Sequence, residues 1–130
     1  MHGVTDSLPI GQFRGARLVA LRPLENIFYF VFERAHSKLA FVRKSEPLSI
    51  GVEGMWQIRG GGGDLIASGN PIPESGLPAV QALLGELVVA SEIRVPESFV
   101  LTLSSGHVLE VFDSNRQYES FSIPEANVYV

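Results

Sequence analysis

Two stretches of this chain, residues 24–50 and 95–123, share one order of strands and turns. Each has an apolar strand, a turn with one histidine, a returning apolar strand, a break and a short last strand. A further apolar strand precedes each stretch, at residues 18–21 and 87–90. Short apolar runs bounded by turn residues are typical of β-strands. The pattern predicts a mainly β (α+β) fold of two antiparallel β units related by an internal pseudo-repeat.

One short helix is expected between the two units, at about residues 77–85. Its apolar side chains recur at the helical spacing i, i+3, i+4 and i+7: Val80, Leu83, Leu84 and Leu87. Pro78 suits the first turn of a helix and Gly85 its C-terminal stop. The 130 residues predict a single domain, with a first β unit at about 15–67, a loop and helix at 69–85, and a second β unit at about 86–130.

The first unit contains the most apolar block of the chain, at residues 27–32. Because this block is apolar at every position, it predicts a central strand covered on both faces. A polar turn is expected at residues 33–37, followed by a returning strand at residues 38–42. A break is expected at residues 45–47, because Pro47 cannot donate a hydrogen bond to a sheet ladder.

Charge is distributed unevenly along the chain. Residues 1–70 carry eight Lys/Arg against six Asp/Glu, whereas residues 71–130 carry two against eight, for a net charge of −4. A chain with a negative net charge is not expected to bind nucleic acid, because such binding requires a concentrated patch of basic residues. There is no cysteine, no visible signal peptide and no apolar run long enough to span a bilayer. A cytoplasmic protein with no membrane association is the expectation.

No set of side chains in the sequence has the spacing of a catalytic, metal or cofactor site. His36 and His107 occupy matching turns, but a metal needs three or four converging ligands, and none lie nearby in the sequence. Tyr118 and Glu119 are neighbours in an expected strand and therefore point to opposite faces. The glycine run at residues 60–63 is followed by an acidic residue and a strand, which predicts a hairpin tip and not a phosphate-binding loop. We expect no enzyme activity and no cofactor.

The second unit resembles a group of small bacterial proteins of unknown function. The resemblance is carried by a hairpin, a polar turn and the element Tyr118-Glu119-Ser120-Phe121. A comparable hairpin unit in the first half and a Trp-containing strand, Trp56-Gln57-Ile58, extend the resemblance over most of the chain from about Gly15. Similar small acidic β-rich proteins serve as immunity partners of bacterial toxins, which is an analogy of type.

These observations favour a non-enzymatic protein that binds a partner protein through a preformed β surface. The most specific version is an immunity-type inhibitor whose acidic C-terminal half covers a basic partner, through Glu97, Glu110, Asp113 and Glu119. The alternative is a small-molecule-binding β protein with a pocket near Trp56 and Tyr118. A further alternative is a homo-oligomer in which the basic half of one copy meets the acidic half of another.

Overall fold

The computed structural model describes residues 10–39, 42–70, 73–94, 98–112, 121–123 and 128–129. Its strands are β1 (Arg17–Pro23), β2 (Phe28–Leu39), β3 (Val42–Val52), β4 (Trp56–Arg59), β5 (Leu65–Gly69), β6 (Pro73–Ser75), β7 (Val88–Arg94), β8 (Ser98–Leu103), β9 (Val108–Phe112), β10 (Phe121–Ile123) and β11 (Val128–Tyr129). The helical elements are a 3-10 turn, η1 (Ile10–Phe13), and one short α-helix, α1 (Leu77–Gln81). None of the helices in these ranges is long and apolar enough to cross a membrane.

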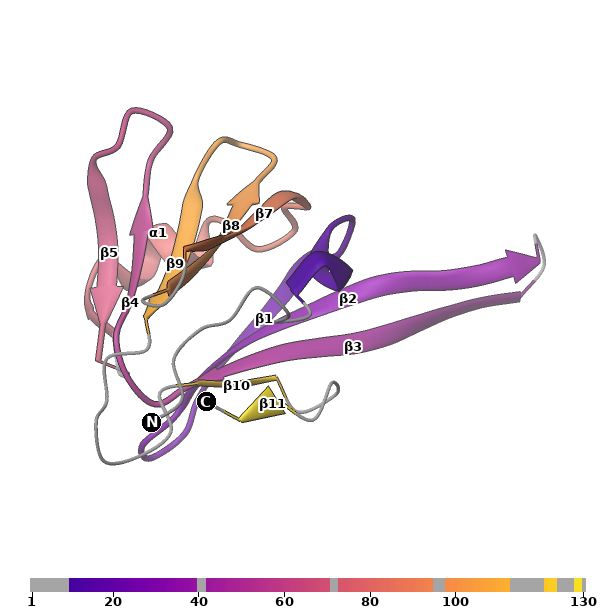
Figure 1. Ribbon diagram of the computed structural model, residues 1–130, viewed down its shortest axis with the longest axis horizontal. Helices are drawn as coiled ribbons and strands as arrows, with labels where there is room; N and C mark the ends of the chain where they lie inside the picture. Colours follow the sequence, from indigo (N-terminus) through magenta and orange to yellow (C-terminus); the bar gives the residue numbers. More distant parts are fainter. Residues whose placement is uncertain are drawn as a thin grey trace.

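The strands form two antiparallel sheets (Figure 1). The first sheet has the order β1-β2-β3-β10-β11 and the second has the order β6-β5-β4-β9-β8-β7. A mainly β fold with two antiparallel sheets and one short helix is therefore confirmed.

Each half of the chain supplies strands to both sheets. After the meander β1-β2-β3, the chain leaves the first sheet, and β4 pairs with β9 of the second sheet, with Trp56 opposite Val111. After the meander β7-β8-β9, the chain returns, and β10 pairs with β3, with Phe121 opposite Val52. Neither predicted unit therefore forms a sheet of its own, because each sheet is completed by strands of the other half.

The predicted pseudo-repeat is not confirmed, and the expected turn at residues 33–37 is wrong. These residues belong to β2, which continues to Leu39, and the predicted break at residues 45–47 lies inside β3. Pro47 is accommodated because β3 has β2 on one side there, while β10 reaches only Val52 and Gly51 on the other. Proline is tolerated at such an edge because no neighbouring strand needs its missing N–H group.

Strand pairing does show one correspondence between the two meanders. The β1–β2 pair has a register shift between Leu18 and Ala20, and the β7–β8 pair has one between Val88 and Ala90. In each case the first strand of the meander carries one extra residue near its start, the third residue of β1 and the second of β7. The correspondence concerns strand pairing and does not extend to the hairpin turns that the sequence suggested.

The two sheets are joined along one edge by main-chain hydrogen bonds. Residues 15–18 run antiparallel to residues 85–88: Gly15 N donates to Val88 O (2.8 Å), and Val88 N donates to Ala16 O (2.8 Å). Leu18 N donates to Glu86 O (2.9 Å), which continues the same ladder. Because this edge is closed by the backbone, the angle between the sheets is set there.

The core lies between the sheets and is rich in aromatic side chains. Trp56 is fully buried, stacks on Phe28 (ring centroids 5.4 Å apart, planes at 13°) and meets Phe30 edge-on (5.2 Å, 84°). Phe28, Phe30 and Phe32 share the buried face of β2, whereas Tyr29 and Val31 on its other face are only half-buried. The apolar block at residues 27–32 is thus central, but only one of its faces is fully covered.

Helix α1 is shorter than the stripe of leucines predicts. It ends at Gln81, and residues 82–85 form turns that lead into β7. Val80 and Leu83 are buried as expected, but Leu84 and Leu87 are 42% and 37% exposed. The reason is local: Gly85 adopts a positive φ of 96°, which ends the helical path and aligns the chain with β1.

Candidate ligand pocket

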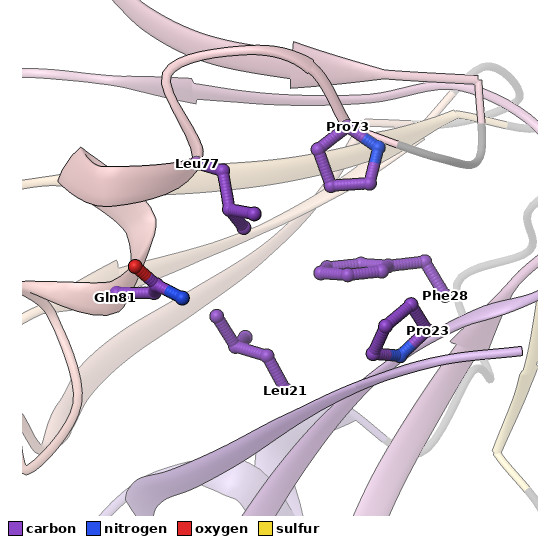
Figure 2. Close-up of a pocket in the computed structure, with 6 residues that line it drawn as sticks. All are labelled: Leu21, Pro23, Phe28, Pro73, Leu77 and Gln81. Atoms are coloured by element: carbon purple, nitrogen blue, oxygen red, sulfur yellow. The ribbon is translucent and has the colours of Figure 1, made fainter.

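An apolar pocket of about 290 Å³ lies between the first sheet and α1. Its walls come from β1, β2, β6 and α1, and the side chains converge on one space (Figure 2): Leu21, Pro23, Phe28, Pro73, Leu77 and Gln81. Leu77 is 37% exposed and Gln81 is also exposed, so the pocket opens to solvent beside α1. Its volume is at the lower end of the range of about 300–1,000 Å³ that is typical of small-molecule sites.

The first wall is built by the tight connection between β1 and β2. Leu24 N donates to Ile27 O (2.8 Å), which closes the turn and places Pro23 opposite Phe28 in the strand register. Two prolines, Pro23 here and Pro73 across the pocket, offer apolar rings without a backbone N–H group. The backbone on both sides is therefore stiff at the positions that contact a ligand.

The second wall depends on Gly76, the residue that precedes α1. Gly76 has a positive φ of 76°, and a Cβ atom there would lie 2.2 Å from Ile66 O of β5. Only glycine can pass the backbone of β5 this closely. The contact fixes α1 against the second sheet, and with it the positions of Leu77 and Gln81 over the pocket.

The floor of the pocket is the aromatic cluster of the core. Phe28 lines the pocket and is stacked on Trp56, so Trp56 lies one side chain behind the cavity and does not line it. Because Phe28 is held by Trp56 and by an edge-on contact with Phe30 at 5.0 Å, the floor is preformed. Trp56 is therefore placed to report on a ligand that contacts Phe28.

The lining has one polar side chain, the amide of Gln81, and no titratable group. Such a surface can bind an apolar molecule and orient one hydrogen-bonding group, since an amide both donates and accepts. Within the described residues, no group of three or more His, Asp or Glu side chains is arranged to hold a metal ion.

Glu110 is the one predicted acidic-surface residue that the structure describes. Its Oε2 accepts a hydrogen bond from Ser98 Oγ (2.5 Å) and lies 3.5 Å from Arg94 Nη1, and its side chain is 14% exposed. The pKa of Arg94 is raised above its usual value, chiefly because its guanidinium donates a hydrogen bond to Glu92. Burial lowers this pKa in part, and the charge of Glu110 raises it further. Glu110 thus holds β8 and β9 together and is not a free anchor for a basic partner.

The other predicted site residues fall outside the described ranges: Glu97, Asp113, Tyr118 and Glu119. The acidic surface, the immunity-type function and the pairing of Tyr118 with Trp56 accordingly stay predictions.

The two histidines do not occupy matching turns. His36 lies within β2, opposite Lys44 of β3, whereas His107 follows the turn between β8 and β9. His107 Nδ1 is 2.6 Å from Ser105 Oγ, and both groups are near the tip of that hairpin. The glycine run at residues 60–63 connects the antiparallel strands β4 and β5, which confirms the expected hairpin tip.

The pocket residues were not singled out from the sequence, and only a weak signal pointed to them. Pro23 and Pro73 mark turns that proved to face each other, and Leu77 precedes the apolar stripe of the helix. No family model, curated protein or solved structure matches this chain, so the resemblance to small bacterial β-rich proteins stays a prediction.

Proposed function

We propose that this protein is a non-enzymatic binding protein whose ligand site is the pocket between the first sheet and α1. The observation that carries the proposal is a preformed cavity of about 290 Å³ with five apolar side chains and one amide. The absence of a titratable group from this lining supports binding over acid–base chemistry. The ligand class that fits is a small apolar molecule with a single hydroxyl or carbonyl group facing Gln81.

The test is a titration of the protein with 1-hexanol, cyclohexanol and cyclohexylmethanol, followed by the fluorescence of Trp56. These probes do not absorb where tryptophan does, and contact with Phe28 changes the surroundings of the stacked indole. We expect a saturable change in emission. A linear response with no saturation for all three probes would contradict the proposal.

Leu77→Gln places a polar group in the pocket wall and should weaken binding at least tenfold. Leu65→Gln is the matched control, because Leu65 is 53% exposed and does not line the pocket. Equal binding by the two variants would show that the fluorescence change arises elsewhere on the molecule.

Gln81→Leu tests the orientation of the ligand. Loss of one hydrogen bond of about 1 kcal/mol should reduce the preference for 1-hexanol over hexane roughly fivefold. An unchanged preference would mean that the amide of Gln81 does not contact the polar group.

A further inference from the structure

The hairpin of β2 and β3 extends well beyond the sheet to which it belongs (Figure 1). The last β1 partner on β2 is Glu33, and β10 pairs only with Val52 and Gly51 of β3. From Arg34 outward, β2 and β3 have only each other as strand partners within the described residues. At about 3.3 Å per residue, the six residues 34–39 give this arm a reach of about 20 Å.

The arm concentrates the positive charge of the chain. Residues 34–44 contain four of the ten Lys/Arg and no Asp or Glu: Arg34, Lys38, Arg43 and Lys44. The rest of the chain has six Lys/Arg against fourteen Asp/Glu. A basic arm is thus attached to a strongly acidic body on the same molecule.

The base of the arm is fixed to the body of the protein by a side-chain hydrogen bond. Arg34 Nη1 donates a hydrogen bond to Gln12 O of η1 (3.2 Å), which anchors the start of the arm. A two-stranded ribbon is only marginally stable alone, and its unpaired edges favour contact with another chain. The arm reaches farther than the Debye length of about 8 Å at physiological salt, so salt largely screens the attraction between its outer residues and the acidic body of its own molecule.

Charge decides which contact is favourable. Pairing of two arms would bring eight Lys/Arg together, and like charges directly opposite each other are destabilising. An arm placed on the acidic body of another copy instead pairs opposite charges on both partners. We propose that the β2–β3 arm docks on the body of a second copy of this chain, so that two copies form a reciprocal two-fold dimer with two equivalent arm contacts.

Sedimentation velocity of the full chain at 50 mM and 500 mM NaCl tests this proposal. We expect a dimer at low salt that dissociates at high salt, because exposed charge pairs are screened. Lys38→Glu/Lys44→Glu should raise the dissociation constant at least tenfold at 50 mM NaCl. Arg14→Glu/Arg22→Glu, which makes the same change of net charge at two exposed positions of the body, should not weaken the dimer.

Four results would overturn the proposal. One is a monomer at both salt concentrations. Another is an unchanged dissociation constant of the Lys38→Glu/Lys44→Glu variant, measured on a variant whose melting temperature matches that of the unaltered protein. The third is arm-dependent binding of a fluorescent 20-base-pair DNA duplex without self-association, which would assign the arm to nucleic acid. Zero-length carbodiimide coupling of mixed ¹⁵N- and ¹⁴N-labelled protein should join Lys38 or Lys44 to a carboxylate of the other copy. Coupling within single copies only would also refute the dimer.

Discussion

The hairpins β2–β3 and β8–β9 occupy equivalent central places in the two sheets but end in different ways. Their bases are alike in one respect, since each first strand buries a row of three side chains on one face: Phe28, Phe30 and Phe32 in β2, and Phe99, Leu101 and Leu103 in β8. In β8, Ser98 and Val100 on the other face are buried as well. The β8–β9 hairpin turns back directly after Leu103, whereas β2 continues to Leu39. The comparison separates the buried bases of the two hairpins from the additional length that only β2 and β3 have.

The tip of β8–β9 is tied to the body of the protein. Ser104 N donates to Leu87 O (2.8 Å), and Ser105 N donates to Glu86 Oε1 (3.0 Å). Among the residues of β2–β3 whose burial the structure describes, the outermost buried ones are Phe32 and Leu48. We relate the additional length of β2–β3 to the proposed contact with a second copy of the chain.

The largest expected effects come from the shared bases. Phe30→Ala should lower the free energy of unfolding by about 3–5 kcal/mol and Leu101→Ala by about 2–5 kcal/mol, because each removes a fully buried side chain. Urea denaturation measures both. A loss below about 1 kcal/mol in either variant would mean that the two bases do not contribute alike.

A smaller loss in the free energy of unfolding is expected when the polar contacts specific to β8–β9 are removed. Glu110→Ala leaves the hydroxyl of Ser98, a residue that is 2% exposed, without this acceptor and should cost about 1–3 kcal/mol. Glu92→Ala is the control, since the Glu92 side chain is 61% exposed in its pair with Arg94, and exposed pairs contribute about 0–1 kcal/mol. Equal losses in the two variants would argue that Glu110 is only a surface charge.

Gly106→Ala, in the tight turn of β8–β9, should lower the free energy of unfolding by about 1 kcal/mol. Gly106 has a positive φ of 93°, while an added Cβ would meet nothing closer than Gly61 Cα at 3.8 Å, so the cost is backbone strain alone. Gly62→Ala should be close to neutral, because Gly62 has no positive φ and open space around it. Thermal unfolding monitored by circular dichroism distinguishes the two.

The smallest effect on stability is expected when the arm is shortened. Replacing residues 35–45 with Asn-Gly keeps Arg34 opposite Glu46 and closes the hairpin with a two-residue turn. Since β2 and β3 have only each other as strand partners there within the described residues, the free energy of unfolding measured at low protein concentration should change by less than about 1 kcal/mol, within the range of surface changes. The same variant should be monomeric at 50 mM NaCl. A large loss of stability would show that the arm belongs to the fold.

Much of the fold class could be predicted from local pattern, because strand burial leaves a period-two signal wherever one face is covered. That signal is present in Phe99, Leu101 and Leu103. It is absent from residues 33–37, whose largely polar sequence suggested a turn in place of a long strand. The local sequence does not indicate that β4 joins the second sheet and β10 the first, since each pairs with strands that are distant in the sequence.

The candidate site was less accessible to sequence reasoning than the fold. Leu21, Pro23 and Phe28 are separated from Leu77 and Gln81 by about fifty residues, and only the packing of α1 beside Gly76 brings them together. Trp56 was chosen as a large aromatic side chain, and the structure places it directly behind the pocket and fully buried. The sequence thus pointed to a core residue behind the pocket and to none of the side chains that line it.

The most direct test of the binding function is a methyl NMR titration of the protein with 1-hexanol. Binding in the pocket predicts saturable shifts of the Leu21 and Leu77 methyl signals, with no shift at Leu65 on the exposed side of β5. Shifts spread evenly over exposed leucines, or none at Leu21 and Leu77 up to the solubility of the alcohol, would contradict a ligand site between the first sheet and α1.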